Sequence, residues 1–307
     1  MKVAVTGATG MIGRALVAAL LERGDDVVVL ARDPTRPRQA LGVNAEAHEW
    51  ADPESQPAPA AAFADADAVV HLAGEPVAHR WTAERKRAIR ESRVHGTEQL
   101  ASAVRAMAVK PRVVLSGSAV GFYGDRGDET VDESAAPGND FLAGVCVEWE
   151  RAAGPIAGVG VRLVQLRTGI VLDPAGGALA RLLPIFRVGA GGPIGSGRQW
   201  MSWIGLHDHV RAMEHALLTD AVRGPVNLVA PNPVTNADFA ATLGRVLARP
   251  ALVPVPSFAL ELLYGEMAPA TLLAGQRVVP LALLGSGFEF AEPTLEGALR
   301  AGLRESR

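Results

Sequence analysis

The sequence predicts an α/β protein with a doubly wound parallel sheet and a smaller, mostly helical C-terminal domain. Three observations support this fold class. A glycine-rich turn joins an apolar strand to an amphipathic helix at the start of the chain, strand and helix patterns alternate through the first half, and glycine and proline become frequent after residue 173. Alternating strands and helices are typical of a parallel sheet with helices on both faces.

The first strand and helix contain the most informative pattern. Residues 3–13 read VAVTGATGMIG, so a short apolar strand runs into three glycines and then into a helix with an apolar face. In a dinucleotide-binding turn the glycines permit the tight turn, the approach of backbone to a pyrophosphate, and close packing of helix on strand. Unless this is an ordinary glycine-rich turn, it predicts a Rossmann domain. Its cofactor site would then contain Gly7, Thr9, Gly10, Met11, Ile12 and Gly13.

The remaining elements follow from hydrophobic periodicity. Strands are expected at 27–31, 67–73, 111–116 and 161–166, with helices near 11–23, 82–108 and 139–153. A long excursion at 175–203 is expected to be helical at 178–188, and a helix near 207–219 and a strand at 225–229 return to the sheet. We therefore assign residues 1–172 and 204–230 to the Rossmann domain, and residues 173–203 and 231–307 to the smaller substrate-side domain.

Composition and charge exclude several classes of partner. The 307 residues carry a net charge of −3 without a long basic run, so we expect no nucleic-acid partner. No apolar run reaches the roughly 18 residues of a membrane span. The single cysteine, Cys146, permits no intramolecular disulfide and lies among apolar residues, where a buried hydrophobic role is expected. A reducing, cytoplasmic location is the expectation.

The type of cofactor is predicted from the end of the second strand. An acidic residue about 20 positions beyond the glycines holds the adenosine ribose of NAD. This chain has Ala31 in that position, followed by Arg32. A guanidinium beside the ribose stabilises a 2′-phosphate through charge-assisted hydrogen bonds, so the sequence favours NADP(H). Asp33 is interpreted as a helix or turn cap, although a register shifted by one residue would make it the ribose ligand.

Three further segments extend the pattern: HLAGE at 71–75, SRVHGT at 92–97 and LSGSAVGFYG at 115–124. With the glycine motif, they resemble the extended short-chain dehydrogenase/reductases, in the epimerase/dehydratase branch. The resemblance implies that Ser118 hydrogen-bonds the reacting oxygen of the substrate and that the loop with Tyr123 borders the substrate. It also implies a set of residues near the cofactor, namely Leu72, Ala73, Gly74, Arg93 and Ser116.

The general acid/base pair of that superfamily is absent. The superfamily has a tyrosine followed four residues later by a lysine, whose charge lowers the pKa of the tyrosine and whose ammonium holds the nicotinamide ribose. The only tyrosines here are Tyr123 and Tyr264, and Gly127 and Ala268 occupy the lysine positions. The resemblance therefore narrows to an atypical subgroup, the "epimerase family protein" or SulA-like proteins, which end in a C-terminal domain of unknown function. The segments that agree are NDFL at 139–142, WE at 149–150, RTGIVL at 167–172, GGPIGSG at 191–197, NLVAP at 227–231, VPVP at 253–256 and LAGQRVVP at 273–280.

Four residues are candidates for chemistry or ligand contact in place of the absent pair. Ser118 is a hydrogen-bond donor near the nicotinamide, and Tyr123 either supplies a proton or packs at the base of its loop. Arg167 ends a strand at the ligand-binding edge of the sheet, where it either contacts the cofactor phosphate or forms a structural ion pair. Arg93 either lies near the cofactor, as the resemblance implies, or belongs to the solvated face of a basic helix.

The glycine-rich excursion is expected to form the substrate pocket. Arg198, Trp200 and Trp203 would suit a small-molecule substrate with an apolar body and an anionic or polar group, although Arg198 is also explained as an unpaired loop residue. The segment HDH at 207–209 has no third ligand at metal spacing. We therefore expect no metal and interpret Asp208 as a helix cap.

Two functions remain open. The first is an NADP(H)-dependent oxidoreductase or epimerase-like enzyme of unknown substrate, with a non-standard proton donor. The alternative is a non-catalytic, dinucleotide-binding regulatory protein, for example one linked to cell division. An open pocket with a polar group within about 3 Å of the reacting oxygen would favour the enzyme. The resemblance also implies a homodimer through the two long helices near 82–108 and 139–153.

Overall fold

The computed structural model describes residues 1–35 and 46–305, and it confirms the predicted fold class. Seven parallel strands form one sheet in the order β11-β7-β5-β4-β1-β2-β3. The direction of strand order reverses between β1 and β4, as in a Rossmann sheet. The strands are β1 (Lys2–Thr6), β2 (Asp26–Ala31), β3 (Glu46–Glu49), β4 (Ala68–His71), β5 (Val113–Ala119), β7 (Arg162–Thr168) and β11 (Gly224–Leu228).

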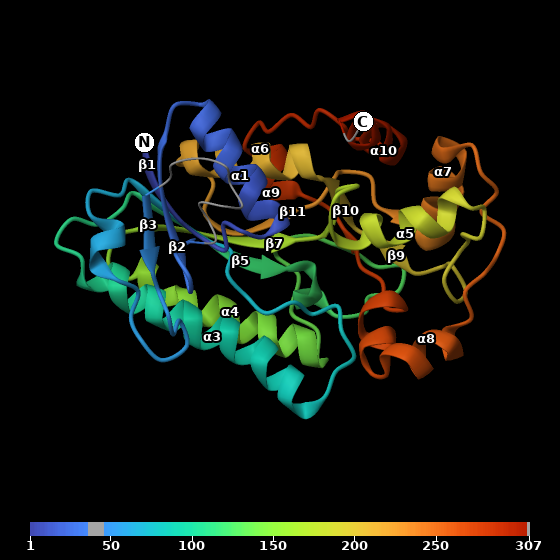
Figure 1. Cartoon of the computed structure of the whole chain (residues 1–307), viewed down its shortest axis with the longest axis horizontal. Helices are drawn as coiled ribbons and strands as arrows, with labels where there is room; N and C mark the ends of the chain where they lie inside the picture. Colours follow the sequence, from blue (N-terminus) through green and yellow to red (C-terminus); the bar gives the residue numbers. More distant parts are fainter. Residues whose placement is uncertain (36–45, 306–307) are drawn as a thin grey trace.

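Helices cover both faces of this sheet (Figure 1). One face carries α1 (Met11–Glu22) and α6 (Leu206–Leu218), and the other carries α3 (Ala83–Ala106) and α4 (Phe141–Ala157). The two long helices begin at side-chain caps, because Thr82 accepts from the N–H of Arg85 and Asp140 accepts from that of Ala143. These positions agree with the helices predicted from periodicity.

The core consists of one apolar layer on each side of the sheet. Val3 and Val5 pack with Leu16 and Met213 on one side, whereas Ala4 packs with Leu100 on the other. Because both faces are covered, the inner strands read as continuous apolar runs. The edge strand β3, with the sequence EAHE, lacks such a run, which is why periodicity did not predict it.

The remaining elements form the excursion and the C-terminal region. In chain order they are η1 (Ala60–Phe63), η2 (Val120–Tyr123), β6 (Thr130–Val131), β8 (Ile170–Leu172), α5 (Gly177–Arg187), β9 (Trp200–Met201), β10 (Trp203–Gly205), β12 (Val234–Thr235), α7 (Asn236–Leu247), α8 (Ser257–Tyr264), η3 (Ala268–Leu272), β13 (Arg277–Val278), α9 (Leu281–Gly285) and α10 (Leu295–Glu305). None of the described helices has the length and apolar character that a membrane crossing requires.

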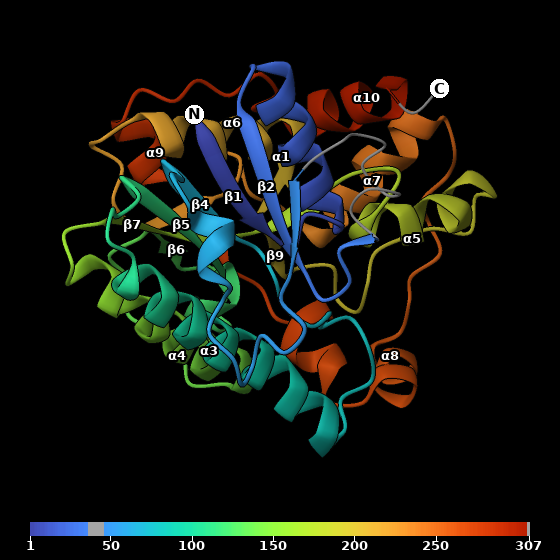
Figure 2. The same ribbon diagram turned by 60° about the vertical axis from the view of Figure 1, so that its left-hand side comes forward.

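Residues of the C-terminal region belong to several apolar clusters. Residues of α5, α7 and α10, such as Leu179, Phe239 and Leu299, form a separate apolar cluster. In contrast, Leu283 of α9 and Phe288 belong to the same cluster as α6. In both views α9 lies beside α6 and away from α7 (Figures 1 and 2). The tail, residues 277–305, therefore packs in part against the sheet. The domain boundaries drawn from the sequence stay a prediction.

Candidate functional site

The glycine-rich turn has the close contacts that exclude side chains. Gly7 has a φ of +71°, and a Cβ there would lie 2.7 Å from the carbonyl carbon of Leu72. A Cβ on Gly13 would lie 2.7 Å from the Cα of Ala8 and would overlap the carbonyl oxygen of Gly7. Gly10 is the N-cap of α1, and no side chain caps the first turn. The N–H groups of that turn are therefore available to an anion at the carboxyl edge of the sheet.

The ends of β1 and β4 are joined at this edge by Thr6. Its Oγ1 accepts hydrogen bonds from the N–H groups of Leu72 (3.2 Å) and Ala73 (3.3 Å). The same oxygen lies 2.7 Å from Nδ1 of His71. Burial lowers the pKa of His71 to about 4, so the ring is neutral and we assign the Thr6 hydroxyl as donor to Nδ1. The predicted cofactor segment at 72–74 is thus fixed next to the glycine turn.

Met11 and Ile12, the two residues after Gly10, pack their side chains against neighbouring parts of the protein. A Cβ on Gly176 would lie 2.6 Å from Sδ of Met11, so the connection between β8 and α5 packs onto the glycine turn. Ile12 packs against the core on the α1 face of the sheet. Thr9 is exposed beside them.

The end of β2 leaves Arg32 exposed. Ala31 is the last residue of the strand, and Arg32 makes no ion pair with any residue that the structure describes. Asp33 accepts hydrogen bonds from the N–H (2.9 Å) and hydroxyl (2.6 Å) of Thr35. This agrees with its interpretation as a turn cap.

The side chain of Arg93 does not lie on the solvated face of α3. Its Nη1 donates to the carbonyl oxygens of Glu75 (2.9 Å) and Ile89 (3.1 Å), and its guanidinium carbon lies 5.1 Å from the Trp149 ring centroid. A Cβ on Gly74 would lie 3.3 Å from that carbon. No described carboxylate pairs with Arg93, and burial lowers the pKa of its guanidinium. Four other basic residues of this helix make surface ion pairs: Arg85, Lys86, Arg87 and Arg90.

At the end of β5, Ser118 does not have the role of donor that the sequence suggested. Its Oγ donates to Oε1 of Glu150 on α4 at 2.7 Å, and the residue is 5% exposed. Its only proton is therefore directed away from a ligand. Ser116, two residues earlier, is buried, and its Oγ has no described partner. The Trp149 ring covers Gly117, where a Cβ would lie 2.7 Å from the indole.

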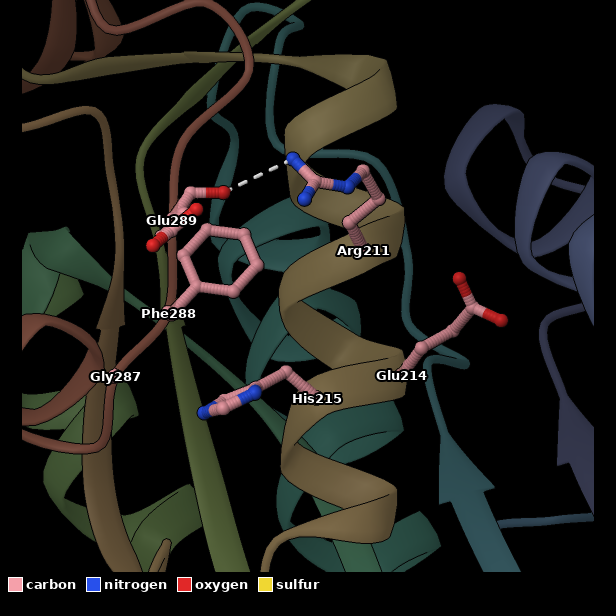
Figure 3. Close-up of a pocket in the computed structure, with 6 residues that line it drawn as sticks. All are labelled: Arg211, Glu214, His215, Gly287, Phe288 and Glu289. Carbon is pink, nitrogen blue, oxygen red and sulfur yellow. Dashed lines mark hydrogen bonds between the residues drawn. The ribbon is translucent and has the colours of Figure 1, made fainter.

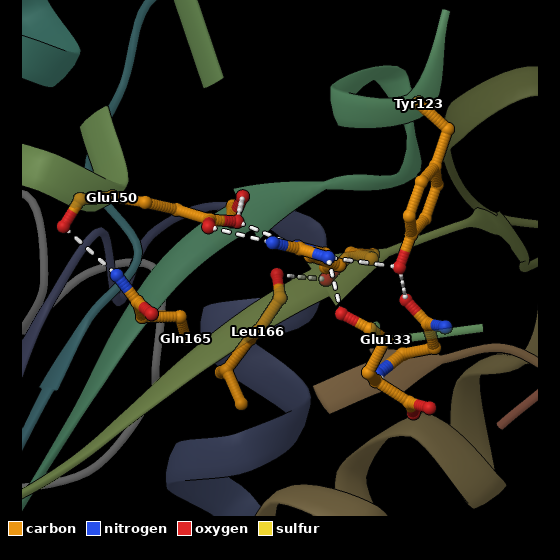
Figure 4. Close-up of polar contacts among 9 residues, drawn as sticks. Tyr123, Glu133, Glu150, Gln165 and Leu166 are labelled. Carbon is orange, nitrogen blue, oxygen red and sulfur yellow. Dashed lines mark hydrogen bonds and ion pairs between the residues drawn. The ribbon is translucent and has the colours of Figure 1, made fainter. Parts of the chain in front are cut away.

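Arg167 forms a structural ion pair with Glu150. This corrects its assignment to the cofactor site. The Nε and Nη2 atoms donate to the two carboxylate oxygens of Glu150 at 2.8 and 2.9 Å, and Nη1 donates to the carbonyl oxygen of Glu133 at 3.2 Å. Figure 4 shows this network between the labelled Glu150, Glu133 and Tyr123. The residue is 4% exposed, and four of its five N–H groups are donated to Glu150, Glu133 and Tyr123, so the guanidinium is committed to the protein.

Tyr123 is also corrected, from candidate proton donor to packing residue. It is fully buried, accepts from Nη1 of Arg167 at 3.0 Å and donates to Oδ1 of Asn227 at 2.7 Å. Burial raises the pKa of its phenol. The neighbouring Cys146 is buried as predicted, and burial raises the pKa of its thiol to about 12.

The tail of the chain completes this network. Nδ2 of Asn227 donates to the carbonyl oxygen of Val279 at 3.0 Å, and the N–H of Val279 donates to Val131 at 3.0 Å. Glu133 accepts at Oε1 from the N–H groups of Asn227 (3.0 Å) and Ala282 (3.2 Å). The sequence offered Glu150 and Asn227 only as parts of family segments. Nothing local marks them as partners of Ser118 and Tyr123.

The three residues predicted to contact the substrate differ in burial and in their partners. Trp203 is fully buried in the C-terminal core, where its Nε1 donates to the carbonyl oxygen of Asn232 at 3.0 Å. Its assignment to the substrate is therefore wrong, because β10 pairs with β8 and carries it inward. Trp200 is half-buried, donates to Asp128 at 2.8 Å and lies 4.4 Å from the guanidinium of Arg277. Arg198 is exposed.

The HDH segment forms the start of α6. His209 is fully buried with its Nε2 3.2 Å from the Thr168 hydroxyl, and burial lowers its pKa to about 3. Asp208 accepts from the N–H groups of Ala291 and Glu292, both at 2.9 Å, so it anchors the tail instead of capping its own helix. Among residues 1–35 and 46–305, no three potential ligands gather at a metal-binding distance.

One open cavity lies away from this edge. It measures about 310 Å³ and is lined by the residues shown in Figure 3: Arg211, Glu214, His215, Gly287, Phe288 and Glu289. Arg211 is held by Asp208 and by the carbonyl oxygen of Glu289. The cavity faces α6 and the tail, and none of its lining residues belongs to the glycine turn or to the Ser118 network.

Comparison with known proteins gives two family matches. Residues 3–228 match the NAD dependent epimerase/dehydratase family, and residues 255–301 match a domain of unknown function, DUF1731. An epimerase family protein of Mycobacterium bovis is 45% identical over 298 residues, which cover 97% of this chain and 96% of that protein.

Two solved structures show the same arrangement. The crystal structure of human epimerase family protein SDR39U1 with NADPH has a TM-score of 0.89 and 34% identity, and the match covers 99% of each chain. A nucleoside-diphosphate sugar epimerase from Corynebacterium glutamicum has a TM-score of 0.79 and 36% identity over 99% of this chain and 58% of that one. The similarity therefore includes the C-terminal region as well as the sheet.

Proposed function

Because this chain belongs to the NAD dependent epimerase/dehydratase family, we propose that it binds NADP(H) at the carboxyl edge of its sheet and acts on a small-molecule substrate as an oxidoreductase or epimerase-like enzyme. The observation that carries the proposal is the glycine turn. Side chains at Gly7 or Gly13 would collide with backbone, and the first turn of α1 is uncapped. Such a turn fits a diphosphate, which needs close backbone and free N–H groups.

The residues that would hold the cofactor lie along three strand ends. The turn from Gly7 to Gly13 would bind the diphosphate, and Leu72, Ala73 and Gly74 would line the adenosine and ribose side. Arg32 supports NADP(H) over NAD(H), because it is exposed at the end of β2 where a 2′-phosphate would lie. The related human protein was crystallised with NADPH, which supports the same choice. The cofactor would supply or accept a hydride beside the Ser118 end of β5.

The hydrogen bonds within the polar network favour a second function, that of a regulatory protein without turnover. Tyr123 and Arg167 are buried in mutual hydrogen bonds, and the proton of Ser118 is donated to Glu150. A regulatory protein that binds dinucleotide without turnover would need none of these groups to be free. Its binding site would be the same glycine turn, so cofactor binding alone does not separate the two functions.

The test has a binding stage and a turnover stage. Calorimetry with NADPH and NADH measures affinity and preference. Carbonyl compounds and nucleotide sugars are then screened with NADPH, and alcohols with NADP⁺, by absorbance of the nicotinamide. Turnover that Ser118→Ala abolishes with little change in NADPH affinity supports the enzyme. Tight NADPH binding without turnover supports the regulator, and failure to bind either cofactor contradicts both.

A further inference from the structure

Large apolar side chains that face solvent gather in one part of the molecule. Of the eleven exposed large hydrophobic residues in the described part of the chain, seven lie within residues 181–188 and 249–263. Leu252 is 83% exposed and Leu262 is 78% exposed, so these segments present nearly whole side chains to water. Single exposed apolar residues are ordinary on a protein surface, whereas a concentration of them marks a site of interaction.

The two segments are neighbours in space. The N–H of Val253 donates to the carbonyl oxygen of Gly191 at 3.1 Å, and Nε of Arg249 donates to that of Arg187 at 2.9 Å. The chain from residue 249 therefore runs beside the end of α5, and α8 follows directly after it. In both views α5 and α8 lie on the same side of the molecule (Figures 1 and 2). We call residues 181–188 and 249–263 together the α5–α8 surface.

The helix α8 forms without burying an apolar face. Six of its eight residues are apolar, yet none is buried. A helix of this length is marginal in water on its own. Its last turn is held from outside by Arg80, whose Nη1 donates to the carbonyl oxygens of Leu262 and Leu263 at 2.8 and 3.4 Å. Phe258 and Leu262, one turn apart on the same side of α8, are left uncovered by the rest of the described chain.

The α5–α8 surface is positively charged, although the whole protein has a net charge of −3. It contains three arginines against the single carboxylate of Glu261. Arg187 is exposed, whereas Arg181 and Arg249 donate to backbone carbonyl oxygens, which do not neutralise their charge. Arg80, which holds α8, is a further exposed cation beside this surface.

Apolar side chains among uncompensated cations match an anionic lipid surface. Such a surface attracts the arginines to its headgroups and accepts the apolar side chains beneath them. It takes side chains from separate segments without the shape complementarity that a protein interface requires. A second copy of the chain is disfavoured, because a two-fold interface would bring the same cations against each other. A contact of this kind needs no spanning helix.

We propose that the α5–α8 surface docks this protein on an anionic membrane. Phe258 and Leu262 enter the interface, and the arginines contact the lipid phosphates. The surface adjoins the carboxyl edge of the sheet, because Ala78 and Arg80, which contact Arg181 and α8, belong to the segment that leaves β4. Docking therefore places that edge close to the membrane. The proposal does not depend on cofactor binding.

Sedimentation of the whole protein with vesicles tests the docking. We expect binding to vesicles of phosphatidylglycerol and phosphatidylcholine in equal parts, weaker binding at high salt, and no measurable binding to phosphatidylcholine alone. Leu262→Ser should lower the partition coefficient about tenfold, as for the loss of one buried leucine side chain. Arg187→Gln should lower it about fivefold. Absence of binding to the anionic vesicles, or equal binding to both kinds, overturns the proposal.

Leu218→Ser and Arg223→Gln are the matched controls, because both residues are exposed and lie outside the α5–α8 surface. They should leave the partition coefficient unchanged, and unfolding in urea checks that all four variants fold. Equal losses in control and test variants place the lipid contact elsewhere and overturn the proposal. Light scattering measures the mass in solution on the same samples. A dimer that Leu262→Ser dissociates assigns the surface to a second copy and also overturns the proposal.

Discussion

The guanidinium of Arg93 on α3 lies over the indole of Trp149 on α4, with 5.1 Å between the guanidinium carbon and the ring centroid. This stack joins the two long helices beside the carboxyl ends of β4 and β5. It holds a cation next to Gly74 without a described carboxylate partner. A half-buried cation without a carboxylate partner at a ligand-binding edge is costly unless a ligand supplies an acceptor.

Replacement of Arg93 by methionine tests that interpretation. Arg93→Met keeps an unbranched stem on Trp149 and removes the charge, so the fold should persist while NADPH affinity falls about tenfold, as for loss of a charge-assisted hydrogen bond. Calorimetry measures the affinity. Arg87→Met, whose guanidinium is exposed and pairs with Glu91 on the same helix, should change it little. Unchanged NADPH affinity in Arg93→Met would remove Arg93 from the cofactor site.

Arg32→Asp should weaken NADPH binding far more than NADH binding. The carboxylate would repel a 2′-phosphate and accept from a ribose hydroxyl, so we expect the ratio of the two affinities to shift by more than about tenfold. Titration of both cofactors into both proteins gives the ratio. Arg223→Asp makes the same charge change at an exposed position outside the site. Equal affinities for NADPH and NADH in the unaltered protein would contradict the role of Arg32.

Gly13→Ala should abolish measurable NADPH binding and destabilise the fold. The added Cβ would overlap backbone of the glycine turn, including Ala8 at 2.7 Å, so the turn must open. Gly144→Ala in α4 is the control, because a Cβ there meets nothing within 4 Å. It should stabilise the helix by about 0.5–1 kcal/mol. Unfolding in urea and calorimetry measure both effects, and wild-type affinity in Gly13→Ala would refute the diphosphate site.

Tyr123→Phe should destabilise the protein by about 1–3 kcal/mol, since it leaves Oδ1 of Asn227 without its donor in a buried site. NADPH affinity should stay the same, because Tyr123 does not reach the glycine turn. Urea unfolding gives the free energy. Tyr264→Phe removes the other, half-buried phenol and should cost less. If the free energy of NADPH binding falls by more than the free energy of unfolding, Tyr123 belongs to the binding site.

The stability of the protein should fall as pH is lowered from about 6.5 towards 4. Burial lowers the pKa of His71 to about 4, so in this range the unfolded chain takes up a proton that the folded protein does not. The full effect is on the order of 3 kcal/mol. His71→Gln should flatten the pH dependence in urea unfolding, and His209, also buried and neutral, should keep part of it. The exposed His95→Gln is the control; an equal slope in both variants would contradict the assignment.

Local pattern predicted the fold and the cofactor turn because both depend on residues close in sequence. Gly7, Gly10 and Gly13 meet within one turn, and Arg32 ends a single strand. The Ser118 site depends instead on distant partners: Glu150 is 32 residues away and Asn227 is 104 residues from Tyr123. Trp203 was misassigned for the same reason. The pairing of β10 with β8, which determines its burial, has no local signal.

The pairing of β13 with β6 has a consequence for synthesis of the chain. Val278 and Val279 contact Val131 and the Asn227 side chain, so these partners stay uncovered until translation has passed residue 279. A nascent chain that ends before residue 278 contains every residue of the glycine turn but lacks the segment that covers Asn227 beside Tyr123. The residues of the glycine turn and those that cover the Tyr123–Asn227 network are therefore synthesised at different stages of translation.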